Sequence, residues 1–302
     1  MAKAIKTIRK FNQLYKSFNF SEIQKGVAAE FLESLIELDP AGNTVHDSRF
    51  DERGQLEEKN TFVYGSHGKL TEHCLLYAAE DVTEKKILNR DEKGRLVEEI
   101  KFYGGDSGER TAYVYDEKDR VCERNYFDEE GDFQSREIFL YDEKGSLAEH
   151  KKFDKDEKLE EQHTFSHNDV DHTILENEFN TDGTLASITV LTFDDKGKEL
   201  SSKKTTHDGK LISGIAMVYD EHGNLSERQI KDFYSKTVRY KYDENNRCIS
   251  NELFDGNGAL IRKNLFEFDE EGNVVAEQTY EMDTTRGGRD KHFGTRYEYE
   301  FY

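Results

Sequence analysis

One turn motif recurs along this chain and constrains its fold more than any other feature. The segment from Tyr141 reads Y-D-E-K-G-S-L, and segments of the same form begin at Phe50, Arg90, Phe127, Tyr219, Phe254 and Phe268. Aspartate at the first turn position accepts hydrogen bonds from the turn backbone, and glycine at the fourth adopts the left-handed conformation that closes a bulged β-hairpin. The residues predicted to form such turns are Asp51, Gly54, Asp91, Gly94, Asp116, Asp128, Gly131, Asp142, Gly145, Asp220, Gly223, Asp243, Asp255, Gly258, Asp269 and Gly272.

Copies of the motif that lack the glycine test this interpretation. Besides glycine, only asparagine and aspartate adopt the left-handed conformation at low energetic cost. Asp119 and Asn246 occupy the glycine position in two copies, as the turn requires. Glu157 occupies it in the copy that begins at Phe153, and that copy does not meet the expectation.

The spacing of the turns sets the size of the repeat. Gly183, Gly197, Gly209 and Gly223 lie 14, 12 and 14 residues apart. Each interval fits one strand of about eight residues plus a short turn. Two intervals therefore define a repeat of 26 residues that contains two strands.

Residues between the turns alternate as they do in strands, but neither face is uniformly apolar. Leu147, Glu149, Lys151 and Phe153 share one predicted face. The chain is 34% apolar and 35% charged, with a mean hydropathy of −0.92, which is too polar for a thick core. An aromatic content of 12% and a single proline argue against disorder. We therefore predict an all-β fold: an elongated, solenoid-like antiparallel β-meander whose single-layer sheet consists of these two-strand repeats.

The first thirty residues depart from the repeat. Ile8, Phe11 and Tyr15 lie near helical spacing, and Ser21 followed by Gln24 resembles a helix capping box. Such helices would cover a sheet edge that is otherwise free to aggregate. The predicted domains are therefore a small helical N-terminal cap over residues 1–30 and an antiparallel β-repeat domain over residues 31–302.

The Y-D-x-x-G-x-L turn between strands flanked by aromatic residues resembles the repeats of the YD-repeat, or RHS-like, family. The resemblance covers roughly residues 37–302, and MORN-type hairpin repeats are more distantly similar. The RHS-like resemblance implies a ribbon of β-sheet that can spiral and that, in large members, encloses a toxic cargo domain. This chain is too short to enclose a domain, so the ribbon is the part that we expect here.

Charge narrows the choice of partners. The net charge of −21 disfavours nucleic acid and anionic lipid surfaces, because like charges repel, and it favours a basic partner. No run of 18 apolar residues is present, so we expect no membrane insertion. Cys74, Cys122 and Cys248 are odd in number and far apart, which predicts neither a disulfide framework nor a zinc site.

The N-terminal residues bear on the location of the protein. Residues 1–15 contain several basic residues and lack the apolar segment of a secretion signal. We expect a cytoplasmic location if this N-terminus is native, and a cell-surface or periplasmic location if a signal peptide was removed.

Tyrosines at alternate positions are the candidate binding residues. Aromatic rings exposed on one strand face can stack on sugars or contact a protein partner, although cross-strand packing produces the same pattern. The candidates are Tyr113, Tyr115, Tyr240, Tyr242, Tyr297 and Tyr299.

Metal binding has two candidates. His163, His167 and His172 surround a predicted turn and are possible ligands, although a polar hairpin tip has the same composition. The aspartate-rich turns suggest calcium, but each offers one well-placed carboxylate where Ca²⁺ binds about six or more oxygens. We therefore expect no metal and no cofactor.

Catalytic signatures are absent from the sequence. It contains no G-x-S-x-G, P-loop, G-x-G-x-x-G or H-E-x-x-H motif. We expect a non-catalytic binding or scaffold protein that presents an acidic, tyrosine-rich sheet face to a protein or glycan. The alternatives are an immunity- or antitoxin-type inhibitor of a basic toxin and a calcium- or carbohydrate-binding cell-surface module.

Overall fold

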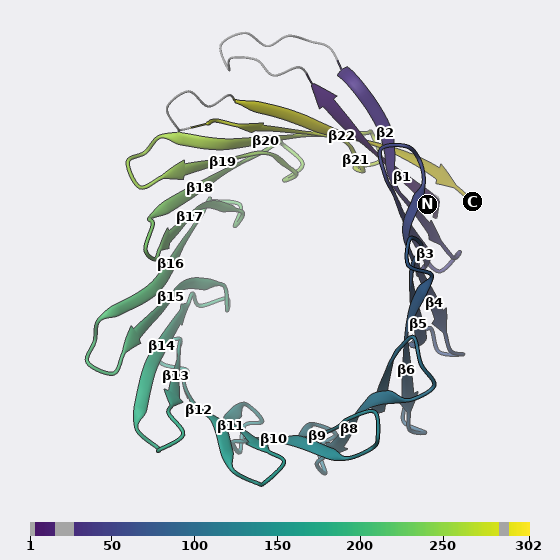
Figure 1. The fold of residues 1–302 in the computed structure, drawn as a ribbon. Coiled ribbons are helices and arrows are strands. Elements are labelled where there is room, and N and C mark those ends of the chain that lie inside the picture. The colour runs from purple at the N-terminus through teal and green to yellow at the C-terminus, as the bar shows by residue number, and fades with distance from the viewer. Residues whose placement is uncertain (1–3, 16–26, 284–289) are drawn as a thin grey trace. The chain divides into compact units, whose positions relative to one another are not determined.

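The computed structural model describes residues 4–15, 27–283 and 290–302, and every helix or strand within these ranges is a β-strand. The strands belong to one 22-stranded antiparallel sheet, which confirms the predicted all-β class (Figure 1). The strands are β1 (Ile5–Tyr15), β2 (Val27–Leu38), β3 (Thr44–Phe50), β4 (Leu56–Tyr64), β5 (Leu70–Tyr77), β6 (Val82–Arg90), β7 (Leu96–Tyr103), β8 (Gly108–Tyr115), β9 (Val121–Phe127), β10 (Phe133–Tyr141), β11 (Leu147–Asp154), β12 (Leu159–Asn168), β13 (Thr173–Phe179), β14 (Leu185–Phe193), β15 (Glu199–Thr206), β16 (Leu211–Tyr219), β17 (Leu225–Lys231), β18 (Lys236–Tyr242), β19 (Cys248–Asp255), β20 (Leu260–Phe268), β21 (Val274–Glu281) and β22 (Lys291–Phe301).

The predicted helical N-terminal cap is wrong. The segment that carries the helical spacing is strand β1, which pairs with β2 along one edge and with β22 along the other. Ile8, for example, lies opposite both Ile36 and Tyr299. Pairing on both edges satisfies the backbone groups of β1, and this tertiary environment outweighs the local spacing. Ser21 and Gln24, the expected capping box, lie outside the described residues.

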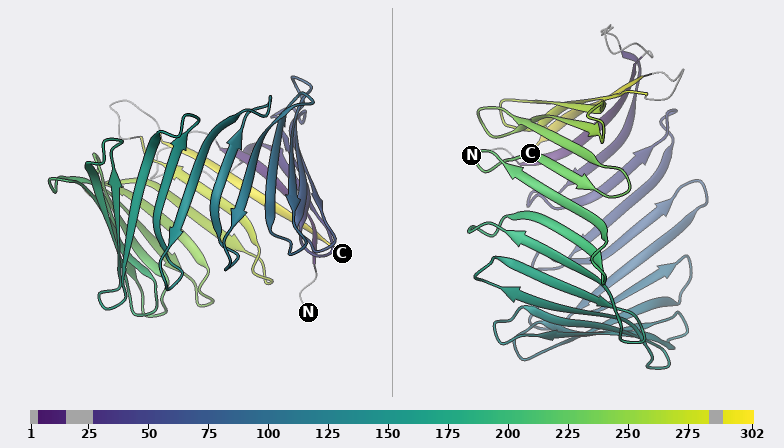
Figure 2. Two further views of the ribbon diagram at one scale, coloured as in Figure 1. Left: turned by 90° about the horizontal axis from the view of Figure 1, so that it is seen from below. Right: turned by 90° about the vertical axis from the view of Figure 1, so that its left-hand side faces the viewer.

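The predicted elongated, solenoid-like meander is also wrong. β1 pairs antiparallel with β22, with Ile8 opposite Tyr299 and Asn12 opposite Thr295. Figures 1 and 2 show the first strand, in purple, beside the last strand, in yellow. An open ribbon would leave unpaired backbone groups along its first and last strands. Pairing of the terminal strands satisfies those groups, so neither terminal strand is a free edge of an open ribbon.

The chain divides into two compact units. The first consists of Met1–Thr83, Val218–Gln229 and Tyr234–Tyr302, and it includes the pairing of the terminal strands. The second consists of Glu84–Met217 and Ile230–Phe233. Within the second unit, β7 to β15 form an unbroken series in which each strand pairs with the next.

The turn between β10 and β11 illustrates why the motif contains aspartate and glycine. The Gly145 N–H donates to the Asp142 carbonyl at 3.0 Å, and the Asp142 N–H donates to the Ser146 carbonyl at 2.8 Å. The Asp142 carboxylate accepts a further bond from the Ser146 N–H at 2.8 Å. Gly145 has a φ of 94°, which lies in the region that glycine adopts without strain.

The other predicted turns have the same form. Each of the nine predicted aspartates accepts a hydrogen bond from the backbone N–H four residues later. Asp119 and Asn246 adopt φ values of 61° and 59° in place of glycine. Glu157, which did not meet the sequence expectation, adopts a φ of 60° all the same, and its carboxylate pairs with the Arg136 guanidinium.

Tyrosines before several turns fasten one strand to its predecessor. The Tyr141 hydroxyl donates to the carbonyl of Val121 at 2.8 Å, and the Tyr115 hydroxyl donates to that of Leu96 at 2.7 Å. Tyr64, Tyr242 and Tyr299 make the corresponding bonds to Thr44, Leu225 and Val274. These bonds give a structural role to the tyrosine that precedes the turn aspartate in three copies of the motif, at Tyr115, Tyr141 and Tyr242.

Little of the sheet is buried. Among the described residues, Tyr280 is the one large apolar side chain that is buried, at 6% exposure. The sheet is therefore stabilised mainly by backbone pairing and by cross-strand side-chain pairs of about 0.2–1 kcal/mol each. In the described part of the chain, no helix has the length and apolar character needed to cross a membrane.

Candidate ligand-binding groove

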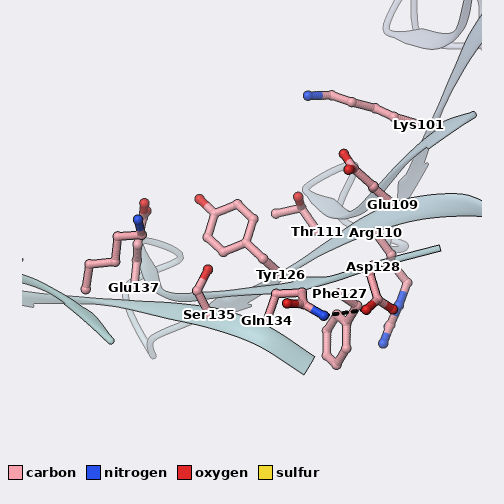
Figure 3. Close-up of a pocket in the computed structure, with 11 residues that line it drawn as sticks. Lys101, Glu109, Arg110, Thr111, Tyr126, Phe127, Asp128, Gln134, Ser135 and Glu137 are labelled. Carbon is pink, nitrogen blue, oxygen red and sulfur yellow. Dashed lines mark hydrogen bonds between the residues drawn. The ribbon is translucent and has the colours of Figure 1, made fainter. Parts of the chain in front are cut away.

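A groove of about 660 Å³ lies on strands β7 to β11 of the second unit. The register places Thr111 opposite Tyr126, and Tyr126 opposite Ser135, so three neighbouring strands contribute one row of side chains. Figure 3 shows these three side chains on the same side of the ribbon. We call this side the groove face.

The groove exists because short side chains lie between long ones. The threonine and serine of the row flank Tyr126, whereas the neighbouring rows carry long charged side chains. Lys101 faces Glu109 at one end, and Glu137 faces Lys152 at the other. The hollow therefore runs diagonally across five consecutive strands, with Tyr126 near its middle (Figure 3).

Side chains that point away from the groove face complete its rim. The Arg110 guanidinium lies 3.8 Å from the centroid of the Phe127 ring, which is a cation–π contact. The Gln134 side-chain amide donates to the Asp128 carboxylate, shown as a dashed line in Figure 3. These contacts hold the hairpin between β9 and β10 beside the groove.

The charges that line the groove balance. Three basic and three acidic side chains contribute to it, although the whole chain carries a net charge of −21. A ligand in the groove therefore meets hydrogen-bond donors and acceptors without a net local charge. The six side chains are Lys101, Arg110, Lys152, Glu109, Asp128 and Glu137.

Neighbouring side chains on the groove face fix the position of Glu137. Its Oε2 accepts a hydrogen bond from Arg124 Nη1 at 3.3 Å and lies 3.9 Å from His150 Nε2. The His150 ring stacks on Phe139 at 4.8 Å and on His163 at 6.0 Å. Burial lowers the pKa of His150, although the negative charge of Glu137 opposes this shift. At neutral pH the histidine is therefore an uncharged, packed support for the carboxylate.

Tyr126 keeps its proton over the physiological pH range. Burial raises the pKa of its hydroxyl, and the nearby charge of Glu137 raises it further. The residue therefore offers an aromatic ring together with a hydroxyl that can donate and accept hydrogen bonds.

The six tyrosines predicted to bind a partner are divided between the two units. Tyr115, Tyr242 and Tyr299 donate their hydroxyls to backbone carbonyls and so hold strands in place. Tyr113 lies on the groove face, with the Arg124 guanidinium 5.9 Å from its ring, but it does not line the groove. The two remaining tyrosines, Tyr240 and Tyr297, lie on β18 and β22 of the first unit.

The three predicted histidines have separate partners. His163 Nδ1 lies 3.0 Å from Glu176 Oε1, and His167 Nε2 lies 3.1 Å from the Leu147 carbonyl. His172 Nε2 lies 3.4 Å from Asp195 Oδ1. Within residues 4–15, 27–283 and 290–302, no group of three or more histidine, cysteine, aspartate or glutamate side chains is arranged to hold a metal ion. All three cysteines are free thiols.

Sequence reasoning missed Tyr126 and the short residues on either side of it. Their signal is an aromatic residue whose cross-strand neighbours on both sides are small and polar. Recognising that signal requires the register of two hairpins, and each contains a bulge, one between Val114 and Tyr115 and the other between Phe133 and Ser135. Alternation within a single strand does not carry this information.

Comparison with known proteins leaves the family open. No family model and no curated protein matches the chain. A porin-like protein from Bacteroides uniformis is similar at 13% identity, over 99% of both chains, with a TM-score of 0.31. TcdB2-TccC3 without its hypervariable C-terminal region is similar at 13% identity, with a TM-score of 0.26. That match covers 87% of this chain and 18% of the other. Similarity at this level assigns neither a family nor a function.

Proposed function

We propose that this chain is a non-catalytic binding protein whose groove on β7 to β11 holds a polar, uncharged ligand of the glycan class. The observation that supports this proposal is the row of Thr111, Tyr126 and Ser135, which places an aromatic ring between two hydroxyl-bearing side chains. A sugar ring has an apolar C–H face that stacks on an aromatic ring and hydroxyls that pair with polar side chains. The groove volume of about 660 Å³ lies within the range of roughly 300–1,000 Å³ typical of ligand sites.

This proposal narrows the expectation of an acidic, tyrosine-rich binding face. One tyrosine, Tyr126, lines the groove, and the surrounding charges balance. We also propose a relationship to the YD-repeat family. It is supported by the recurrence of the turn, by its aspartate hydrogen bonds and by the left-handed fourth residue.

A glycan array followed by calorimetric titration tests the proposed function. We expect an uncharged glycan to bind, and we expect Tyr126→Ala to weaken its binding about tenfold or more because the stacking surface is lost. Tyr240→Ala, on β18 of the other unit, is the matched control and should bind normally. Equal affinity for the Tyr126→Ala variant and the unmodified protein would contradict the proposal.

A second candidate function is the binding of a basic protein, as an immunity- or antitoxin-type inhibitor would do. The specific observation is that the glutamate after the turn aspartate is exposed in turn after turn, so carboxylates project from the hairpin tips. The residues are Glu52, Glu92, Glu117, Glu129, Glu143, Glu221, Glu244 and Glu270.

Salt dependence separates the two candidates. A basic partner held at the hairpin tips should dissociate as salt rises, because charge steering is screened. Its binding should weaken when tip glutamates are changed to lysine and should be unaffected by Tyr126→Ala. Glycan binding in the groove should be insensitive to salt and to changes of the tip glutamates, and Tyr126→Ala should weaken it.

A further inference from the structure

The length of the groove limits the ligands that can fill it. Lys101 comes from β7 and Lys152 from β11, so the lining residues span five consecutive strands. Neighbouring strands lie about 4.8 Å apart, so a groove that crosses four such spacings diagonally is at least about 19 Å long. A single sugar would occupy the region around Tyr126 and leave both charged ends unfilled.

The charged side chains on the groove face lie at the two ends of the groove. Each end carries one ammonium group opposite one carboxylate, namely Lys101 with Glu109 and Glu137 with Lys152. In the middle, the cross-strand neighbours of Tyr126, Thr111 and Ser135, are uncharged. Each end can therefore donate to and accept from hydroxyl groups, and neither end favours a ligand with a formal charge.

We infer that the groove binds a linear, neutral oligosaccharide laid across β7 to β11, with a central sugar stacked on Tyr126 and a terminal sugar at each charged pair. This inference rests on the proposed function. The expected length is about four units, since one sugar unit is about as long as one strand spacing of about 4.8 Å. A charged glycan gains nothing over a neutral one, because an ammonium group and a carboxylate lie opposite each other at each end of the groove.

The lysines at the two ends can contact a four-unit ligand but not a single sugar stacked on Tyr126. Lys101 is 45% exposed and lies 3.6 Å from Glu99, and Lys152 is 31% exposed and lies 3.0 Å from Glu160. Both ammonium groups thus have neighbouring carboxylates and still face solvent. A hydroxyl at either end of the ligand can accept a hydrogen bond from the lysine and donate one to the carboxylate opposite it.

Calorimetric titration of the full chain with neutral oligosaccharides of one to six units, taken from the series that binds best, tests this inference. We expect the affinity to rise with length and to level off near about four units, because longer chains extend past the last strand spacing of about 4.8 Å. Lys101→Met and Lys152→Met should each weaken binding of the four-unit ligand about tenfold and leave binding of the single sugar unchanged. Lys236→Met, at the start of β18, is the matched control.

The outcomes separate this inference from the proposed function. If a single sugar binds as tightly as the four-unit ligand and Tyr126→Ala weakens both, the length inference fails and the proposed function stands. If no neutral saccharide binds at any length, both fail. If an acidic oligosaccharide binds more tightly than its neutral counterpart of the same length, the inference of a neutral ligand is overturned. A thermal unfolding curve for each variant excludes loss of binding through misfolding.

Discussion

Where β22 lies between β21 and β1 in the first unit, aromatic rings fill one face of the sheet. His292 is stacked between Tyr15 at 3.7 Å and Tyr280 at 4.2 Å, and both His292 and Tyr280 are only 6% exposed. Gly294 makes room for this packing, because a Cβ at that position would lie 3.1 Å from the Tyr15 ring.

The groove face of the second unit also carries an aromatic residue on a central strand, but its cross-strand neighbours are short and polar. Tyr126 has threonine and serine as cross-strand neighbours, where His292 has tyrosine rings on both sides. Both regions use the same antiparallel pairing, so the difference arises from which residues face one another. In a sheet with so little buried surface, filling a face requires stacked rings, and a row of short side chains leaves a hollow.

The largest expected effect compares the two tyrosines directly. Tyr280→Ala should lower the free energy of unfolding by about 3–5 kcal/mol, as truncation of a buried aromatic residue does. Tyr126→Ala should lower it by about 1 kcal/mol, because the ring is only partly buried. Denaturant unfolding measures both changes. Similar losses for the two variants would show that the groove tyrosine, too, is mainly structural.

The next effect concerns the turns, which are common to both regions. Gly131, between β9 and β10, has a φ of 87°, and nothing lies within 4 Å of a Cβ built on it. Gly131→Ala should therefore destabilise the protein by about 1–2 kcal/mol through backbone strain alone. Glu157→Gly should stabilise it by about 0.5–1 kcal/mol, because it relieves the same strain. Changes of the same sign in thermal unfolding would contradict this explanation.

A smaller effect is expected at the tyrosines that hold strands together. Tyr141→Phe removes the hydroxyl that donates to the Val121 carbonyl at 2.8 Å. The variant should lose about 1 kcal/mol of stability, the usual net contribution of one hydrogen bond. Hydrogen exchange should show faster exchange for β9 and β10, and an unchanged exchange pattern would remove the role assigned to this hydroxyl.

The smallest effect is a dependence on pH at His150. Burial lowers its pKa in the folded state, so below the ordinary histidine pKa of about 6.5 the unfolded chain binds more protons than the folded chain does. The stability from the neutral ring is therefore fully present above that pH and decreases as the pH falls. His150→Phe should make stability less dependent on pH between about 6.5 and 5. An unchanged slope would contradict the assignment.

The parts of this fold that can be predicted from sequence are those set by neighbouring residues. Asp142 and Gly145 specify their turn within five residues, so strands and turns follow from the local pattern. The N-terminal segment could not be assigned in this way, because β1 is a strand only through pairing with β2 and β22. Its partner β22 is nearly the whole chain away in sequence.

The groove could not be predicted for a related reason. Thr111, Tyr126 and Ser135 lie on three successive strands and become neighbours only through the register of β8, β9 and β10. The tyrosines chosen from sequence follow the alternation within single strands, and three of them instead donate hydrogen bonds to backbone carbonyls. Periodicity within a strand identifies residues that share a face, whereas this groove depends on which residues of neighbouring strands lie opposite one another.

A crystal structure of the chain with the best-binding neutral oligosaccharide tests the central claim most directly. We predict one sugar ring stacked on Tyr126 and hydroxyl groups within hydrogen-bond distance of Lys101 and Lys152. A ligand bound to another surface, with the Tyr126 groove empty, would contradict it.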